Sequence, residues 1–317
     1  GLPGPRGECF TAPLAERYLS LHGADEETVE FYASRCGGAG SVLELGCGDG
    51  RVLLAVSDRS GLEDAAGRHH VGLEIEPELV ERCQRLASSR GVRVVEGDMA
   101  NFSLGERFDA ILMPSSTLYC LRSEEQVLEC LKSVRRHLAE GGEFVFDCYN
   151  VDEILDEDWG WEGAGGPVDS EHGQLVRRLP GEDAFEKSRH LASEQTFVVR
   201  YTHVPTAGTP GAAEAEALVS YELRHRYLKS HQVRELLAAA GLEATSVAGG
   251  FAGEAFEPDS PRMVVACAHA GTAALAPGWV VCEEFGEFGP AAEEGPSDDE
   301  DDGWDFQDAA GREPITS

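Results

Sequence analysis

The nine residues VLELGCGDG (42–50) constrain the fold of this chain more than any other segment. An apolar run typical of a buried strand leads directly into three glycines, and a helical pattern follows over 50–57. Gly46, Gly48 and Gly50 let the backbone turn tightly and let a ligand approach without a Cβ in the way. The segment therefore predicts a strand, a ligand-binding turn and a helix in direct succession.

The spacing of the glycines argues against a dinucleotide ligand. A dinucleotide-binding loop reads G-x-G-x-x-G and needs a third glycine at position 51, where this chain has Arg51. Glu44 stands two residues before the first glycine, and its carboxylate disfavours a diphosphate. We therefore expect a ligand with an ammonium group or another positive centre, and a nicotinamide or nucleotide-sugar enzyme is the weaker alternative.

The first half of the chain alternates strand-like and helix-like segments, as βα units that feed a parallel sheet do. The last of the helices begins with the capping box Ser123-Glu-Glu-Gln126. Upstream, residues 13–35 have a helical pattern broken at Gly23. The expected strands cover 41–45, 69–74, 92–96, 108–113 and 142–148, and the expected helices cover 50–57, 77–89 and 123–139.

After residue 150 the pattern favours antiparallel strands. Residues 151–180 show no clear period, and a Pro/Gly/Ala-rich loop separates the later strands. From Gly271 onward Pro, Gly, Glu and Asp dominate, so no packed core is expected there. We expect a core formed by 1–150 and 229–270, an inserted antiparallel cover at 151–228 and a disordered acidic tail at 271–317. The expected strands are 184–191, 194–204, 217–228, 242–248 and 261–269, with a helix at 231–241.

Acidic residues stand at the ends of successive strands. Glu74 ends the second strand, where a carboxylate can accept both hydroxyl groups of a ribose. Asp98 follows the third strand and can accept from an adenine amine, while Met99 can pack on the adenine ring. Together with Glu44, these residues predict a site for a positively charged adenine nucleoside.

These residues resemble the motifs of class I S-adenosylmethionine-dependent methyltransferases. The resemblance rests on VLELGCGDG, Glu74, GDM (97–99) and FDAILMPSSTLYCL (108–121) followed by HLAEGGEFVFD (137–147). It implies an α/β fold with a doubly wound, seven-stranded, mostly parallel sheet whose last strand, 261–269, is antiparallel. It also implies S-adenosylmethionine as cofactor, with the glycine loop at its amino-acid part, Glu74 at the ribose and Asp98 at the adenine. The cofactor-binding candidates are Glu44, Gly46, Cys47, Gly48, Glu74, Asp98, Met99 and Pro114.

The chain is most similar to the small-molecule methyltransferases of this class, in which antiparallel strands inserted after the fifth strand cover the acceptor. Transfer of a methyl group from a sulfonium is a direct displacement, so the protein mainly aligns the acceptor and excludes water. No nucleophile triad or metal ligand set is required, and none is visible. Residues 114–119, which follow the fourth strand, are expected at the site, with Tyr119 among the catalytic candidates.

Two further catalytic candidates each have a packing alternative. Tyr18 resembles an N-terminal tyrosine that closes over the cofactor in related enzymes, but it also suits the core side of an amphipathic helix. YELRHRY (221–227) alternates as a strand, and His225 could be the general base because its usual pKa is near working pH. The alternation favours the interpretation that His225 packs on an amphipathic sheet face.

Charge and cysteine content limit the partners. The chain has 26 Lys and Arg against 58 Asp and Glu, so it repels phosphate backbones, which excludes nucleic acid and anionic membranes as main partners. Nine cysteines without CxxC spacing predict free thiols in the reducing cytoplasm rather than disulfides or a metal site. The acidic aromatic tail, with EEFGEF (283–288), is either a solvated segment or a motif that binds a protein partner. A non-catalytic adaptor that uses this tail is the alternative to the enzyme.

Overall fold

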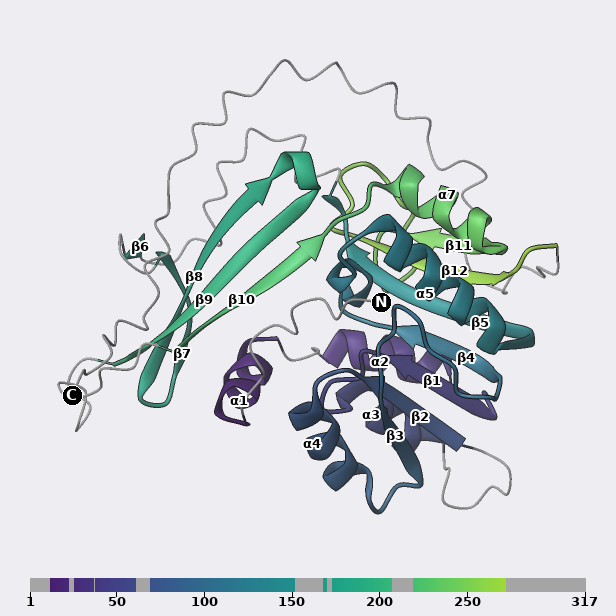
Figure 1. The fold of residues 1–317 in the computed structure, drawn as a ribbon, viewed down its shortest axis with the longest axis horizontal. Coiled ribbons are helices and arrows are strands. Elements are labelled where there is room, and N and C mark those ends of the chain that lie inside the picture. Colours follow the sequence, from purple (N-terminus) through teal and green to yellow (C-terminus); the bar gives the residue numbers. More distant parts are fainter. Residues whose placement is uncertain are drawn as a thin grey trace, which may run out of the picture. The chain divides into compact units, whose positions relative to one another are not determined.

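The computed structural model describes residues 12–22, 26–36, 38–60, 69–151, 168–169, 173–206 and 219–271. They form two β-sheets and the helices associated with them (Figure 1). Apart from Gly271, the acidic tail expected over 271–317 lies outside the described residues, as does the loop 207–218. No helix of the described ranges is both long and apolar enough to span a membrane.

The larger sheet has seven strands in the order β11-β12-β5-β4-β1-β2-β3 (Figure 1). Strand β12 runs antiparallel to both of its neighbours, and the other neighbouring pairs are parallel. This arrangement confirms the doubly wound, mostly parallel sheet with an antiparallel last strand. The strands are β1 (Ser41–Leu45), β2 (His69–Glu74), β3 (Val92–Glu96), β4 (Phe108–Met113), β5 (Leu138–Tyr149), β11 (Leu242–Ala248) and β12 (Arg262–His269).

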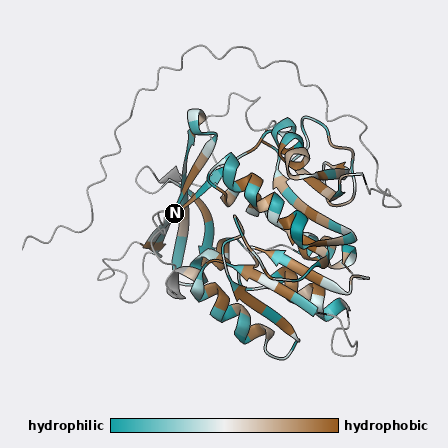
Figure 2. Cartoon of the chain, turned by 45° about the vertical axis from the view of Figure 1, so that its right-hand side comes forward, coloured by the Kyte–Doolittle hydropathy of each residue, from teal (hydrophilic) through white to brown (hydrophobic). Residues whose placement is uncertain are grey.

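Helices cover both faces of this sheet because successive strand residues point to opposite faces. Val42 of β1 packs in a cluster with α2 and α3, whereas its neighbour Leu43 packs in a cluster with α5 and α7. Figure 2 shows hydrophobic residues concentrated in the central strands and hydrophilic residues on the surrounding helices. Ser123 Oγ accepts from the Gln126 amide at 3.3 Å, so the expected cap begins α5. The helices are α2 (Glu26–Arg35), α3 (Arg51–Ser60), α4 (Pro77–Ala87), α5 (Glu124–His137) and α7 (Ser230–Ala240).

The second sheet, which we call the cover sheet, is inserted between β5 and α7 and is antiparallel throughout. Tyr221, Leu223 and His225 alternate along β10, and Tyr221 and His225 pair across the strands with Tyr201 and Phe197 of β9. One face of the cover sheet is therefore rich in aromatic side chains. Its strands are β6 (Val168–Asp169), β7 (Gly173–Leu179), β8 (Glu182–Leu191), β9 (Thr196–Pro205) and β10 (Val219–Arg226).

Helix α1 (Ala12–Leu21) contacts both the cover sheet and the core. Arg17 donates to Glu182 of β8, with Nη2 and Oε2 at 2.9 Å, and Arg177 of β7 donates to the Ser20 carbonyl. On the core side, Arg51 at the start of α3 donates from Nη2 to the His22 carbonyl at 3.1 Å. The end of α1 is thus fixed between the two parts of the molecule.

Three strands differ from the sequence expectation, and one of them is β6, which falls within 151–180 where no strand was expected. Strand β5 begins at Leu138, directly after α5, because Leu138 pairs with Phe108 of β4 before a register shift leads to the pair Ala110–Glu143. A Cβ on Gly142 would lie 3.0 Å from the carbonyl oxygens of Phe108 and Asp109, so this irregular pairing requires glycine. Strand β7 falls within 151–180, where no strand was expected, because a bulge next to Leu175 interrupts its alternation.

Candidate active site

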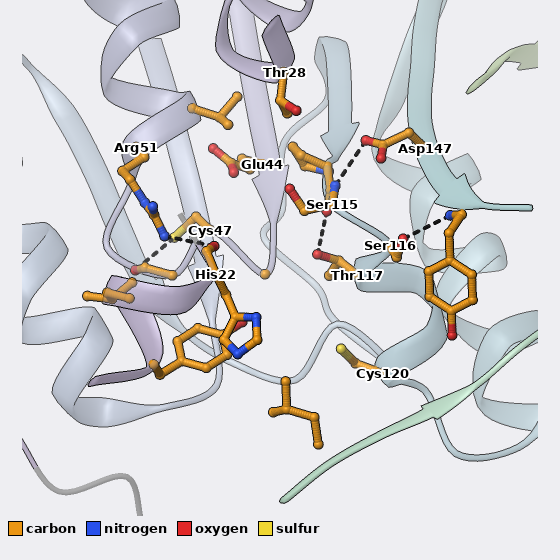
Figure 3. Close-up of a pocket in the computed structure, with 18 of the residues that line it drawn as sticks. His22, Thr28, Glu44, Cys47, Arg51, Ser115, Ser116, Thr117, Cys120 and Asp147 are labelled. Atoms are coloured by element: carbon orange, nitrogen blue, oxygen red, sulfur yellow. Dashed lines mark hydrogen bonds between the residues drawn. The ribbon is translucent and has the colours of Figure 1, made fainter. Parts of the chain in front are cut away.

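A cavity of about 360 Å³ lies at the carboxyl ends of β1, β4 and β5 (Figure 3). This is the edge at which open α/β sheets bind their ligands. The glycine turn, the turn after β4 and the end of β5 form its core side, and α1 and β10 form the other side. Of the residues expected from the sequence, Tyr18, Glu44, Gly46, Cys47, Gly48, Pro114 and His225 line this cavity.

The glycine turn has the backbone conformation that its sequence predicts. Gly46, Gly48 and Gly50 have φ values of +66°, +55° and +87°, which favour glycine. A Cβ on Gly46 would meet the Thr117 side chain at 2.5 Å, whereas a Cβ on Gly48 would meet no atom within 4 Å. Gly48 therefore keeps open the space beside the cavity that a ligand can use.

Glu74 holds the glycine turn in place. Its Oε2 accepts from the Gly48 amide at 2.9 Å, and its Oε1 accepts from the amides of Ile75 and Glu76 at 2.8 and 3.0 Å. The carboxylate thus connects the turn after β1 to the segment that leads into α4. Glu74 is not among the cavity-lining residues, but it is one hydrogen bond away from them through Gly48.

Glu44 presents a buried carboxylate to the cavity (Figure 3). Its residue is 3% exposed, and its Oε2 atom has no hydrogen-bond partner among the described residues. Burial, and after it the nearby Cys83 thiol, raise the pKa of Glu44 well above its usual range. A buried acceptor without a partner is costly, so this atom is suited to a ligand that brings a hydrogen-bond donor with positive charge.

A strained turn joins β4 to the cavity. Ser115 and Ser116 both have positive φ values, 60° and 57°, which are uncommon for residues with a side chain. Asp147 at the end of β5 stabilises this turn, because its Oδ1 accepts from the Ser115 amide at 2.9 Å and its carbonyl accepts from the Ser116 amide at 3.0 Å. Tyr32 of α2 donates its hydroxyl proton to the same Oδ1 at 2.6 Å.

Two histidines from outside the core contribute to the cavity wall. The Nε2 atom of His22, just after α1, lies 3.2 Å from the Tyr221 hydroxyl, and His225 of β10 stacks on Tyr149 with 5.9 Å between ring centroids. Burial lowers the pKa of each histidine to about 4. Both imidazoles are therefore neutral at pH 7 and can accept a proton or a hydrogen bond.

Besides Glu74, three expected residues do not line this cavity. Asp98 is exposed beyond the end of β3, and its Oδ1 accepts from the Ala100 amide at 2.8 Å, while Met99 packs against the core. Tyr119 is 1% exposed, and its hydroxyl group lies within hydrogen-bond distance of the carbonyl oxygens of Tyr149 and Leu228, at 3.2 and 3.1 Å. Asp98 and Met99 follow β3, which is next to β2 at the same edge of the sheet. Tyr119 connects the core to the segment after β10.

Sequence reasoning missed Asp147, Tyr32, His22 and Arg262. Asp147 obeys the rule that identified Glu44 and Glu74, since it is an acid at the end of a strand, and that signal would have found it. His22 and Arg262 carry no comparable signal because distant parts of the chain bring them to the cavity.

Comparisons with known proteins agree with this geometry. Residues 42–142 match the family model described as a methyltransferase domain. A cypemycin N-terminal methyltransferase from Streptomyces sp is 24% identical over 225 residues, which are 71% of this chain and 81% of that protein. A dTDP-3-amino-3,4,6-trideoxy-alpha-D-glucopyranose N,N-dimethyltransferase from Streptomyces venezuelae is 26% identical over 133 residues, 42% of this chain and 52% of that protein. The structure of the CcbJ methyltransferase from Streptomyces caelestis has a TM-score of 0.66 at 22% identity, covering 83% of this chain and 97% of that one.

The strand order, the glycine turn and the matched domain define a methyltransferase. The matched domain and the similar proteins support a class I S-adenosylmethionine-dependent methyltransferase with S-adenosylmethionine as its methyl donor. The comparisons support the enzyme and give no support to the alternative of a non-catalytic adaptor.

Proposed function

We propose that the cavity binds the methionine part of S-adenosylmethionine and that the enzyme methylates an amine nitrogen of a small-molecule acceptor. The observation that carries the proposal is Glu44, which lines the cavity beside the glycine turn and whose buried Oε2 atom has no hydrogen-bond partner in the described residues. The cofactor's methionine part has the ammonium group that such an atom requires. The open space at Gly48 gives that group room.

The other cofactor contacts follow from the order of the strand ends. Gly46, Cys47 and Pro114 line the cavity next to Glu44 and would contact the amino-acid part. Glu74 would hold the ribose, since Oε2 accepts only one backbone amide and keeps a lone pair for a hydroxyl group. Asp98 and Met99, one strand further along, would contact the adenine.

When bound, S-adenosylmethionine supplies a methyl group on a positively charged sulfur. The residues of the chain then orient the acceptor and exclude water. Tyr18 and Leu19 from α1 and Leu223 from β10 line the side of the cavity opposite the sheet edge. We assign the cover sheet, within 151–228, the role of enclosing the acceptor, and the core, 1–150 and 229–270, the role of binding the cofactor.

An amine acceptor is supported by the site and by the relatives. The similar proteins are named as an N-terminal methyltransferase and an N,N-dimethyltransferase. His225 is neutral and lines the cavity, so its imidazole can accept the proton that a nitrogen acceptor loses. Tyr119 would act indirectly, by fixing the Tyr149 carbonyl next to the ring that stacks on His225. The free cysteines of the described residues support a site of action in the reducing cytoplasm.

Calorimetry tests the cofactor site. Wild-type protein should bind S-adenosylmethionine and release protons on binding, because the ammonium group lowers the pKa that burial raises at Glu44. Affinity should then rise with pH, since the free protein holds the proton that the complex has lost. Glu44→Gln should bind about tenfold more weakly and release no proton. Binding of wild type without proton release, or equal binding by Glu44→Gln, would contradict this role of Glu44, and no binding at all would contradict the proposed function.

The pH profile of kcat/KM tests His225. Because burial lowers the pKa of His225 in the free protein to about 4, the imidazole is in its proton-accepting form throughout the neutral range. The contribution of His225 to the acid limb of kcat/KM should therefore lie near pH 4 rather than near 6.5, and His225→Asn should lower kcat about tenfold to a hundredfold and remove that limb. A variant with unchanged kcat would leave His225 with a packing role only.

A further inference from the structure

Arg262, at the start of β12, is a cationic residue that lines the cavity. Its side chain is 30% exposed, and it makes no hydrogen bond to any described residue. A guanidinium group has five N–H donors in a planar fork. An arginine at the edge of a ligand cavity with these donors available is a candidate for ligand recognition.

The nearest carboxylate does not satisfy this arginine. The Arg262 Nη1 atom is 3.8 Å from the Asp147 Oδ2 atom, beyond the 2.7–3.2 Å of an N–H···O hydrogen bond. The other oxygen of Asp147 already accepts from Tyr32 and from the Ser115 amide. Asp147 is therefore committed to the turn after β4, and it balances the charge of Arg262 without occupying its donors.

Packing restrains the Arg262 guanidinium group. The Cζ atom of Arg262 lies over the Phe251 ring, 4.2 Å from its centroid, and Phe251 in turn stacks on Phe31 with 4.7 Å between ring centroids. A cation–π contact of this kind leaves the N–H donors of the guanidinium for another group. This arrangement suits a partner that offers two oxygen atoms.

The position of Arg262 assigns it to the acceptor and not to the cofactor. β12 pairs with β5, and Arg262 is opposite Tyr149, the residue whose ring stacks on His225. The glycine turn is on β1, two strands further along the sheet from β5. Arg262 is therefore anchored on the side of the cavity that β5 and β12 form, where Tyr149 also lines it.

We propose that Arg262 is a specificity-determining residue that binds an oxyanion group, carboxylate or phosphate, of the acceptor, and so selects amines that carry an anionic group elsewhere in the molecule. The inference rests on the proposed function. Arginine binds both kinds of oxyanion through two parallel hydrogen bonds, so their chemistry at this site is shared. With a fixed anion at one end, the amine at the other end is aligned for methylation.

The experiment uses methyl-labelled S-adenosylmethionine with the full-length enzyme and a metabolite extract of the source cells. Products labelled by wild type are isolated, and the parent acceptor is tested before and after two treatments. One is amidation of carboxylates with a carbodiimide while the acceptor amine is protected, followed by deprotection, and the other is removal of phosphate with a phosphatase. One of the two treatments should raise KM tenfold to a hundredfold and identify which oxyanion is bound. Arg262→Met should raise the KM for the untreated acceptor by the same factor, tenfold to a hundredfold. For the acceptor that has lost its anionic group, the substitution should change KM little. The decrease in kcat should be smaller than the increase in KM. Arg262→Lys should fall between wild type and Arg262→Met, because lysine keeps the charge without the fork.

Arg224→Met is the matched control, because Arg224 is exposed on β10 and its neighbours along the strand, Leu223 and His225, are the ones that line the cavity. Arg224→Met should leave the KM for the acceptor unchanged. Arg224→Met and Arg262→Met should both bind S-adenosylhomocysteine as wild type does. A labelled acceptor without an oxyanion group, or an Arg262→Met variant with unchanged KM, would overturn the inference and leave the proposed function standing. A wild-type enzyme that binds cofactor but labels no compound would overturn both.

Discussion

Replacing Gly48 by valine should abolish binding of S-adenosylmethionine, with a loss of affinity of at least about a thousandfold. Gly48 has a φ of +55°, and a Cβ built on it meets no protein atom within 4 Å. The Cβ of a valine would therefore enter the space beside the cavity without meeting the protein. The positive φ adds a backbone penalty of about 1–2 kcal/mol, which tends to move the turn away from the geometry that Glu74 holds. Titration calorimetry with S-adenosylmethionine and S-adenosylhomocysteine measures the loss.

Gly91 provides the control for backbone strain. It has a φ of +65°, is exposed before β3, and would also accept a Cβ without contact within 4 Å. Gly91→Val should lower the free energy of unfolding about as much as Gly48→Val does and should bind cofactor normally. Weak cofactor binding by both variants would mean that backbone strain anywhere in the fold is enough to weaken binding. Strong binding by Gly48→Val would show that the cofactor does not use this turn.

Replacing Glu74 by alanine should have the second largest effect, on both stability and binding. The substitution leaves the amides of Gly48, Ile75 and Glu76 without their acceptor. We expect the free energy of unfolding to fall by about 3 kcal/mol, because hydrogen bonds to a charged acceptor are lost and water replaces them only partly. Cofactor affinity should fall by about a hundredfold or more, since the glycine turn and the ribose contact are lost together. Denaturant unfolding and calorimetry measure the two effects.

Glu96 is the corresponding acid at the end of the neighbouring strand β3, and its side chain is exposed. Glu96→Ala should change neither stability nor cofactor affinity appreciably. Glu74→Gln should be intermediate, because one amide oxygen can still accept from the turn. If Glu74→Ala bound cofactor as wild type does, the carboxylate would have no role at the site.

Local sequence signals were sufficient for the core of the fold. The run of apolar residues before the glycines predicted β1, and acids at the strand ends predicted which edge of the sheet carries the site. These features depend on neighbours in the sequence, and parallel sheets place successive strand ends together. The seven-stranded sheet with its antiparallel last strand followed from the resemblance to a known family.

Features that depend on distant parts of the chain were not predictable in the same way. The left-handed conformation of Ser115 and Ser116 is stabilised by Asp147, more than thirty residues later, and no local propensity favours it. The low pKa of His22 comes from burial beneath the cover sheet. The position of Arg262 at the cavity depends on the pairing register of β5 and β12, which only the folded protein defines. Strand β7 was missed because its bulge breaks the period of two.

Helix α1 gives the enzyme a mechanical property. Arg17 anchors the helix to β8 of the cover sheet, and the carbonyl of His22, at its far end, is held by Arg51 from the helix that follows the glycine turn. The side chains between these two anchors, Tyr18 and Leu19, face the cavity. A movement that withdraws α1 must therefore break contacts with the cover sheet and with the core at the same time. The methyl donor and the acceptor would then gain access to the cavity through the same movement.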